Sequence, residues 1–178
     1  MLKQAGAALG LALACAAPAW AQLAQNSNGP VDLTADELEV VNNDCAAIWR
    51  GSAEALQDTA RLRADVLKIY NLKGPPKAGG TGPNCGEVDR MEALGNVYYV
   101  TPQQRVRGDN AVYQATADTI VFTGDVIAVR GKNVLRGSRL TINVKTNAAQ
   151  MESNAKGRNS PNRVRGVLYP KDKTQASK

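Results

Sequence analysis

Two glycine-bounded stretches decide the fold of this chain: GNVYYVTPQQRVRG at residues 95–108 and GDVIAVRGKNVLRG at residues 124–137. They align without a gap at a period of 29 residues, so that Val97 matches Val126. A partial third copy ends at Gly166. A fixed internal period determines an architecture, because each copy is one structural unit that covers its apolar face against its neighbours. We therefore expect a fold built from repeated units.

Apolar and polar residues alternate within each copy. Leu140, Ile142 and Val144 share one face of an extended chain, with polar residues between them. This period of two is typical of half-buried strands. The sequence predicts long antiparallel strands joined by short turns, in which the recurring glycines mark bends or bulges. The best helix candidate, residues 44–56, falls in a repeat register that makes much of it strand.

One segment interrupts the repeat. Residues 73–88 (KGPPKAGGTGPNCGEV) are rich in Gly and Pro and show no periodicity, which predicts an inserted, exposed loop. The loop carries Cys85, and Cys45 lies in another expected connection between strands. Cleavage of the export signal described below would remove Cys15 and leave these two thiols, and an even number of thiols in an exported chain favours one disulfide between them. The alternative is a pair of free, buried cysteines.

The N-terminus has the pattern of an export signal. A single early cation, Lys3, precedes an apolar run over residues 5–17, a helix-breaking proline and the triplet AWA at residues 19–21. This order is typical of a secretory signal peptide, so we expect residues 1–21 to be cleaved and the mature chain to be soluble and extracytoplasmic. A lipoprotein signal ending at Cys15 is the alternative, but the large aliphatic residue usual upstream of such a cysteine is missing.

The charge of the chain favours anionic partners. Its formal net charge is +6. Outside the cytoplasm, a mildly basic surface meets acidic lipid headgroups or acidic glycans more often than nucleic acid. A nucleic-acid-binding role also lacks the aromatic residues that such proteins interleave with their basic segments. The polar residues 171–178 are expected to form a disordered tail.

No catalytic constellation stands out in the sequence. The chain contains no histidine, which removes the commonest general base and the commonest metal ligand. Asp65 and Asp109 recur at one repeat position and are expected at turns or strand entries. The RGD triplet at residues 107–109 occupies a repeated position too and is expected to be structural. We therefore expect no enzymatic activity, no cofactor and no metal site.

Three ordered segments carry a resemblance to a known family. They are LTADELEV at residues 33–40, ARLRADVLKIYN at residues 60–71, and MEALGNVYYV to RLTINV within residues 91–144. Together they resemble the OstA-type domain of the LptA-like lipopolysaccharide transport proteins. This resemblance implies an all-β, repeat-built antiparallel β-jellyroll over residues 22–170, formed by a V-shaped pair of facing sheets that is open at both ends.

The resemblance also implies a function. Members of the family shield the acyl chains of lipid A in an apolar interior between the inner and outer membranes, which places this chain in the periplasm. The expected partners are lipopolysaccharide, inner-membrane and outer-membrane transport components of the same fold family, and further copies of the chain bound head to tail. The inserted loop and the cysteine pair depart from the usual pattern, and an insertion near a sheet edge could block such pairing.

The inward-facing residues of the expected strands are the candidate lipid lining. Their alternative role is the packed core of an ordinary β-sandwich, and the alternative function is a non-transporting scaffold or an acidic-glycan-binding module of the cell envelope. The lining candidates are Val97, Tyr99, Tyr113, Ile120, Phe122, Val126, Leu140 and Ile142. Candidates for contacting lipid phosphates are Arg105, Arg107, Arg130, Arg136 and Arg139.

Overall fold

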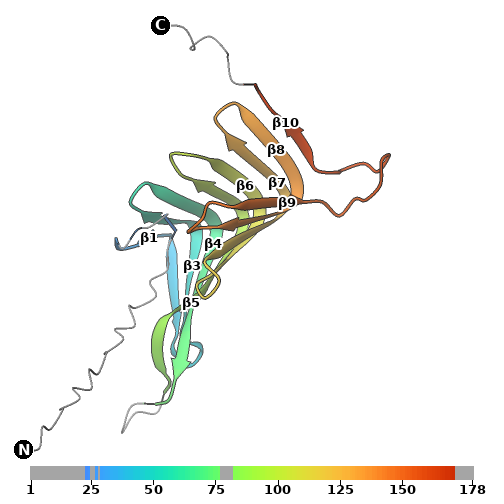
Figure 1. Cartoon of the computed structure of the whole chain (residues 1–178). Coiled ribbons are helices and arrows are strands. Elements are labelled where there is room, and N and C mark those ends of the chain that lie inside the picture. Colours follow the sequence, from blue (N-terminus) through green and yellow to red (C-terminus); the bar gives the residue numbers. More distant parts are fainter. Residues whose placement is uncertain (1–22, 25–26, 28, 77–81, 171–178) are drawn as a thin grey trace, which may run out of the picture.

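The computed structural model describes residues 23–24, 27, 29–76 and 82–170, so the expected signal peptide and C-terminal tail lie outside the described residues. The described residues form one antiparallel sheet of ten strands (Figure 1). The strands are β1 (Asp32–Thr34), β2 (Glu37–Val41), β3 (Ala46–Gln57), β4 (Ala60–Gly74), β5 (Asn84–Val100), β6 (Arg105–Gln114), β7 (Thr119–Arg130), β8 (Asn133–Asn143), β9 (Ala149–Glu152) and β10 (Arg165–Val167), and a short 3-10 helix, η1 (Asn42–Asp44), precedes β3.

Neighbouring strands in the sheet follow the order of the chain from β3 to β8. The hydrogen-bonded order is β1-β3-β4-β5-β6-β7-β8-β10, with β2 also paired to β3 and β9 also paired to β8. This arrangement confirms the prediction of an all-β fold made of long antiparallel strands. The helix candidate at residues 44–56 is almost entirely β3, as the repeat register indicated.

A bulge near the middle of each long strand pair bends the sheet into two facing halves. The bulges fall at Arg50/Ala53, Arg63/Val66, Leu94/Val97, Arg107/Asn110 and Thr123/Val126. On one side of this line of bulges the sheet starts at β1 and ends at β10, and on the other side it starts at β2 and ends at β9. We call these the β1–β10 half and the β2–β9 half. They form the expected V-shaped jellyroll, which does not close on itself.

The repeated Asp and Gly residues explain the bulges. Gly124 has a φ of 101°, a left-handed conformation that glycine adopts without a steric penalty. A Cβ atom at this position would collide with Oδ2 of Asp109 on the neighbouring strand. The same arrangement places Asp36 over Gly51 and Asp65 over Gly95.

The expectation that Asp65 and Asp109 lie at turns or strand entries is therefore wrong. Both residues lie inside long strands, β4 and β6, where their carboxylates fill the space above a bulged glycine. The repeat period detects the bulges as readily as it would detect turns, because both recur once per unit. The RGD triplet at residues 107–109 lies at one of these bulges, inside β6.

The two ends of the inserted segment extend a hairpin. β4 runs to Gly74 and β5 starts at Asn84, and these two residues are cross-strand partners. An exposed loop over the whole of residues 73–88 is therefore wrong, since Gly and Pro reveal the turn but not the paired arms. A disulfide joins Cys45 to Cys85, with their Cα atoms 5.3 Å apart. It ties the extended hairpin to the start of β3.

Candidate functional site

The inner face of the bent sheet carries one cluster of buried apolar side chains. Every residue proposed as lining from the sequence belongs to this cluster, with exposed fractions between 0% and 3%. They lie on four consecutive strands: Val97 and Tyr99 on β5, Tyr113 on β6, Ile120, Phe122 and Val126 on β7, and Leu140 and Ile142 on β8. The structure therefore brings the whole predicted set together on one surface.

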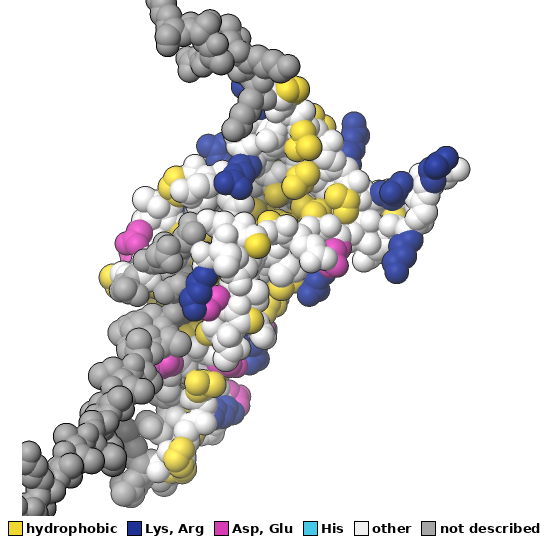
Figure 2. Space-filling model, in the orientation of Figure 1, with side chains coloured by type: hydrophobic (Ala, Val, Ile, Leu, Met, Phe, Trp, Pro, Cys, Tyr) yellow, Lys and Arg dark blue, Asp and Glu magenta, His cyan; other side chains and the backbone are white. Residues whose placement is uncertain are grey.

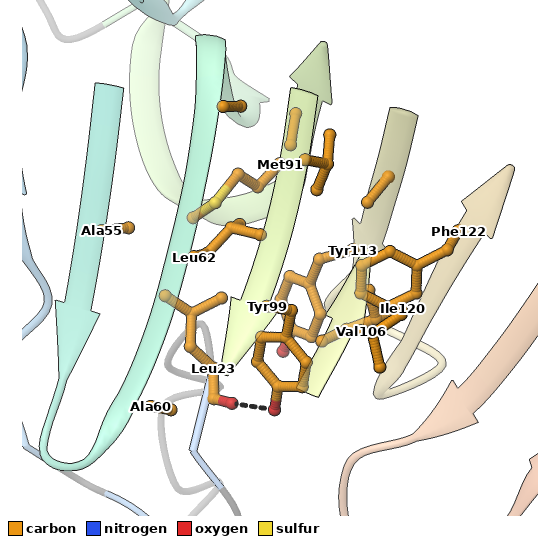
Figure 3. Close-up of a cluster of buried hydrophobic side chains, with 14 of the residues drawn as sticks. Leu23, Ala55, Ala60, Leu62, Met91, Tyr99, Val106, Tyr113, Ile120 and Phe122 are labelled. Carbon is orange, nitrogen blue, oxygen red and sulfur yellow. Dashed lines mark hydrogen bonds between the residues drawn. The ribbon is translucent and has the colours of Figure 1, made fainter. Parts of the chain in front are cut away.

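Two aromatic rings connect the two halves across this interior. Tyr99 belongs to the β1–β10 half, and Phe122 belongs to the β2–β9 half. Their ring centroids are 6.0 Å apart and their planes are tilted by 39°, within the usual range for an aromatic pair. Figure 3 shows both residues among the aliphatic side chains of the cluster. The inner faces of the two halves therefore contact each other at this aromatic pair.

The lining proposed from the sequence left out the β3–β4 side of the interior. Ala53, Ala55 and Leu62 are buried there, at alternate positions along their strands. The period-two signal was present, but alanines give it little hydrophobic contrast. Leu23 also belongs to the cluster and is 1% exposed. No periodic pattern surrounds Leu23, so nothing in the sequence points to its place.

A short polar network borders the apolar cluster on the β1–β10 half. The hydroxyl of Tyr99 donates a hydrogen bond of 2.7 Å to the backbone oxygen of Leu23 (Figure 3). Gln57, which is 1% exposed, lies at the end of β3 and accepts hydrogen bonds from the backbone N–H groups of Leu23 and Ala24. Burial raises the pKa of Tyr99 to about 12, so its phenol keeps the proton that it donates well into the alkaline range.

The interior is less covered toward β8 and β10. Leu135 pairs across the strands with Ala128 and with Gly166, and both Leu135 and Ala128 are only half-buried. Beyond β10 the apolar Leu168 is 70% exposed. Figure 2 shows hydrophobic side chains uncovered over β8 and β10, with Lys and Arg side chains around them. This end of the jellyroll is therefore open.

Arginines gather at the same end of the molecule. Arg136, Arg163 and Arg165 line a cavity of about 860 Å³ between β8, β10 and the segment that precedes β10. Arg136 is ion-paired with Asp125 at 2.9 Å. All five arginines proposed from the sequence are exposed: Arg105, Arg107, Arg130, Arg136 and Arg139.

Other kinds of site were also sought in the described part of the chain. Within it, no group of three or more His, Cys, Asp or Glu side chains is placed to hold a metal ion. A search of the same residues for a helix of sufficient length and hydrophobicity to cross a bilayer finds none.

Comparisons with known proteins agree with the fold. The crystal structure of LptH from Pseudomonas aeruginosa, described as the LptA-homologous periplasmic component of the lipopolysaccharide transport device, superposes with a TM-score of 0.64 at 14% identity and covers 80% of this chain and 96% of its own. An uncharacterized protein from Rhizobium meliloti (strain 1021) is 31% identical over 146 residues, which are 80% of this chain and 76% of that protein.

The family model described as the LptA/(LptD N-terminal domain) LPS transport protein matches residues 32–148. This range starts at β1 and ends just before β9, so it contains every long strand and the whole line of bulges. The chain therefore belongs to the LptA and LptD N-terminal domain family of lipopolysaccharide transport proteins.

Proposed function

We propose that this protein is a non-enzymatic periplasmic carrier that bridges the inner and outer membranes and shields the acyl chains of lipid A in its interior. The single observation that carries the proposal is the apolar inner face, which is continuous from the β3–β4 side to the half-covered end at β8 and β10. Membership of the lipopolysaccharide transport family supports the choice of lipid.

The chemistry of the interior suits acyl chains. Its lining is aliphatic and aromatic, and fatty acyl chains need dry surface and no hydrogen-bond partners. Burying such chains is favourable by about 25 cal/mol for each Å² of apolar surface removed from water. The exposed Leu168, which directly follows β10, continues the apolar surface to the outside. We infer that lipid enters and leaves through this open end.

The arginines at the open end suit the other part of the lipid. Lipid A carries phosphates on its sugar headgroup, and a guanidinium group binds phosphate with two parallel hydrogen bonds. Arg163 and Arg165 line the cavity beside β10, the strand that ends just before the exposed Leu168. A lipid with its chains inside the jellyroll would therefore hold its headgroup against a basic surface.

The ends of the sheet suit partners of the same fold. The edge strands β1 and β2 at one end and β9 and β10 at the other present backbone groups that can pair with a further strand. Val40 on β2 is 61% exposed, which gives the first edge an apolar contact surface. We propose head-to-tail pairing with further copies of the chain and with inner-membrane and outer-membrane transport components. The extended hairpin is clipped back to β3, away from β9 and β10.

Photocrosslinking at the open end tests this function. A photoreactive amino acid replaces Leu135, whose cross-strand partner Ala128 pairs in turn with the buried Val106. The matched control replaces Val134, the adjacent residue, which points to the opposite face of the same strand. We expect lipopolysaccharide to crosslink from position 135 and only weakly from position 134. Equal yields, or none from either folded variant, would leave a packed scaffold or glycan-binding module instead.

A further inference from the structure

The first described residues of the chain lie against the interior. Leu23 is 1% exposed and packs in the buried cluster, near Leu62 and Tyr99 (Figure 3). The phenol of Tyr99 donates its hydrogen bond to the backbone of this same residue. Tyr99 is also one of the proposed lining residues. Leu23 therefore occupies apolar surface that the proposed function assigns to lipid.

A buried glutamine fastens this segment to the end of β3. Oε1 of Gln57 accepts hydrogen bonds from the N–H groups of Leu23, at 2.6 Å, and Ala24, at 3.1 Å. Nε2 of the same side chain donates to the backbone oxygen of Gly29 at 2.9 Å. The side chain of Gln57 thus binds backbone groups at both ends of the segment, at Leu23 and Ala24 and at Gly29.

A second contact fastens the segment to Asp58, the residue that follows Gln57. The hydroxyl of Ser27, a residue that is 5% exposed, donates a hydrogen bond to the carboxylate of Asp58. The N–H group of Gly29 in turn donates to the Ser27 hydroxyl oxygen at 3.1 Å. These contacts lie at the rim of the β1–β10 half, where β3 turns into β4.

The segment also faces the opposite half of the jellyroll. Ala24 lines a cavity of about 150 Å³ together with Tyr99 from the β1–β10 half and Ile142 and Val144 from the β2–β9 side. Tyr99 and Ile142 are both in the proposed lining. The segment therefore lies where the facing halves approach each other.

We propose that Leu23, Ala24, Ser27 and Gly29 form a strap that fills one end of the interior in the empty protein and is displaced when a fatty acyl chain enters. This inference rests on the proposed lipid-binding function. Leu23 and an acyl chain compete for the same apolar surface. The backbone groups that leave Gln57 can form hydrogen bonds with water, which lowers the free-energy cost of displacing the strap. Only molecules in which the strap is open bind lipid. The apparent lipid affinity is therefore the intrinsic affinity multiplied by the fraction of open molecules.

Hydrogen exchange followed by NMR tests displacement in the exported, purified protein. The amides of Leu23 and Ala24 are expected to be protected in the empty protein because Gln57 accepts their hydrogen bonds. Adding lipid A in detergent micelles is expected to remove this protection, whereas micelles alone are not. Protection that persists in the lipid-bound protein overturns the strap. If no lipid binds and Leu135 gives no crosslink, the proposed function fails and the strap fails with it.

A variant with a matched control gives an independent readout. Gln57→Met keeps the length of the side chain and removes its hydrogen bonds to the strap, so lipid A is expected to bind about tenfold more tightly. The control, Gln114→Met, changes an exposed glutamine at the end of β6 and is expected to leave the affinity unchanged.

A third variant avoids the buried position. Ser27→Ala removes the contact with Asp58 and is expected to strengthen lipid binding in the same direction by a smaller factor. Circular dichroism verifies that each variant is folded. Folded Gln57→Met and Ser27→Ala proteins with unchanged or weaker affinity would contradict the proposal.

Discussion

Tyr99 illustrates how one side chain combines packing and polarity. Its ring contacts Phe122 across the interior, and its hydroxyl donates to the backbone of Leu23. The alternating pattern predicted the buried ring from the sequence. The hydrogen bond could not be predicted, because its acceptor lies 76 residues away in a segment without periodicity.

The buried phenol makes stability depend on pH in the alkaline range. Burial raises the pKa of Tyr99 from 10.0 to about 12, so the folded protein keeps a proton that the unfolded chain loses. The stabilisation is complete below about pH 10 and is lost as the pH rises toward about 12. A shift of this size corresponds to roughly 2 to 3 kcal/mol.

Denaturant unfolding of the native protein and of Tyr99→Phe measures this effect. Between about pH 9 and pH 11.5, the free energy of unfolding is expected to fall more steeply for the native protein than for Tyr99→Phe. The exposed Tyr98, changed to Phe, is the control and is expected to keep the native slope. Parallel slopes for all three proteins would show that Tyr99 is not buried as described.

The bulges are the elements that turn a flat sheet into two facing halves. The internal period of the sequence predicted their recurrence and the glycines that occupy them. The period did not distinguish a bulge from a turn. A bulge is defined by how two neighbouring strands pair, and a repeat in the sequence carries no information on that pairing. Asp65 and Asp109 were misplaced for this reason, although the structure confirms that they occupy equivalent positions.

Gly124→Ala tests the bulge directly. The left-handed φ costs an alanine about 1 to 3 kcal/mol, and its Cβ would also collide with the carboxylate of Asp109. We therefore expect a loss of at least that size in the free energy of unfolding, measured by denaturant titration. Gly82→Ala is the matched control, since no atom lies within 4 Å of its Cβ position. Equal stabilities of the two variants would refute the role of Gly124.

The disulfide stabilises the extended β4–β5 hairpin by restricting the unfolded chain. It closes a separation of 40 residues. A loop of this length is expected to contribute about 3 to 4 kcal/mol. The Cys45→Ser, Cys85→Ser double variant should therefore unfold at a lower denaturant concentration than the oxidised protein.

Reduction provides the control for that comparison. The reductant is expected to lower the denaturation midpoint of the native protein to that of the double variant, while leaving the variant unchanged. A double variant as stable as the oxidised native protein would show that the bond does not constrain the unfolded chain. The sequence predicted this pair from the even count left after signal cleavage, while the paired arms of the hairpin were hidden by the Gly- and Pro-rich residues between them.

At the scale of the whole molecule, the two halves enclose an apolar interior that is capped differently at its two ends. Leu23 and the Gln57 network occupy the β1–β10 half near β3 and β4, whereas β8 and β10 leave Leu135 and Leu168 accessible. Alternation predicted the interior on β5 to β8 but gave no information on its ends. The ends depend on which segments return to cover the sheet, and the segment containing Leu23 does so without any repeating pattern.

The central claim is that lipid is held by its acyl chains inside this interior. Equilibrium binding of the purified protein to intact lipopolysaccharide, to lipopolysaccharide without its phosphates and to fully deacylated lipopolysaccharide tests it most directly. We predict that removing the phosphates weakens binding by about tenfold, as expected for charge-assisted hydrogen bonds at an exposed rim, and that removing the acyl chains abolishes it. Deacylated lipopolysaccharide that binds as tightly as the intact molecule would contradict the claim and favour a glycan-binding surface.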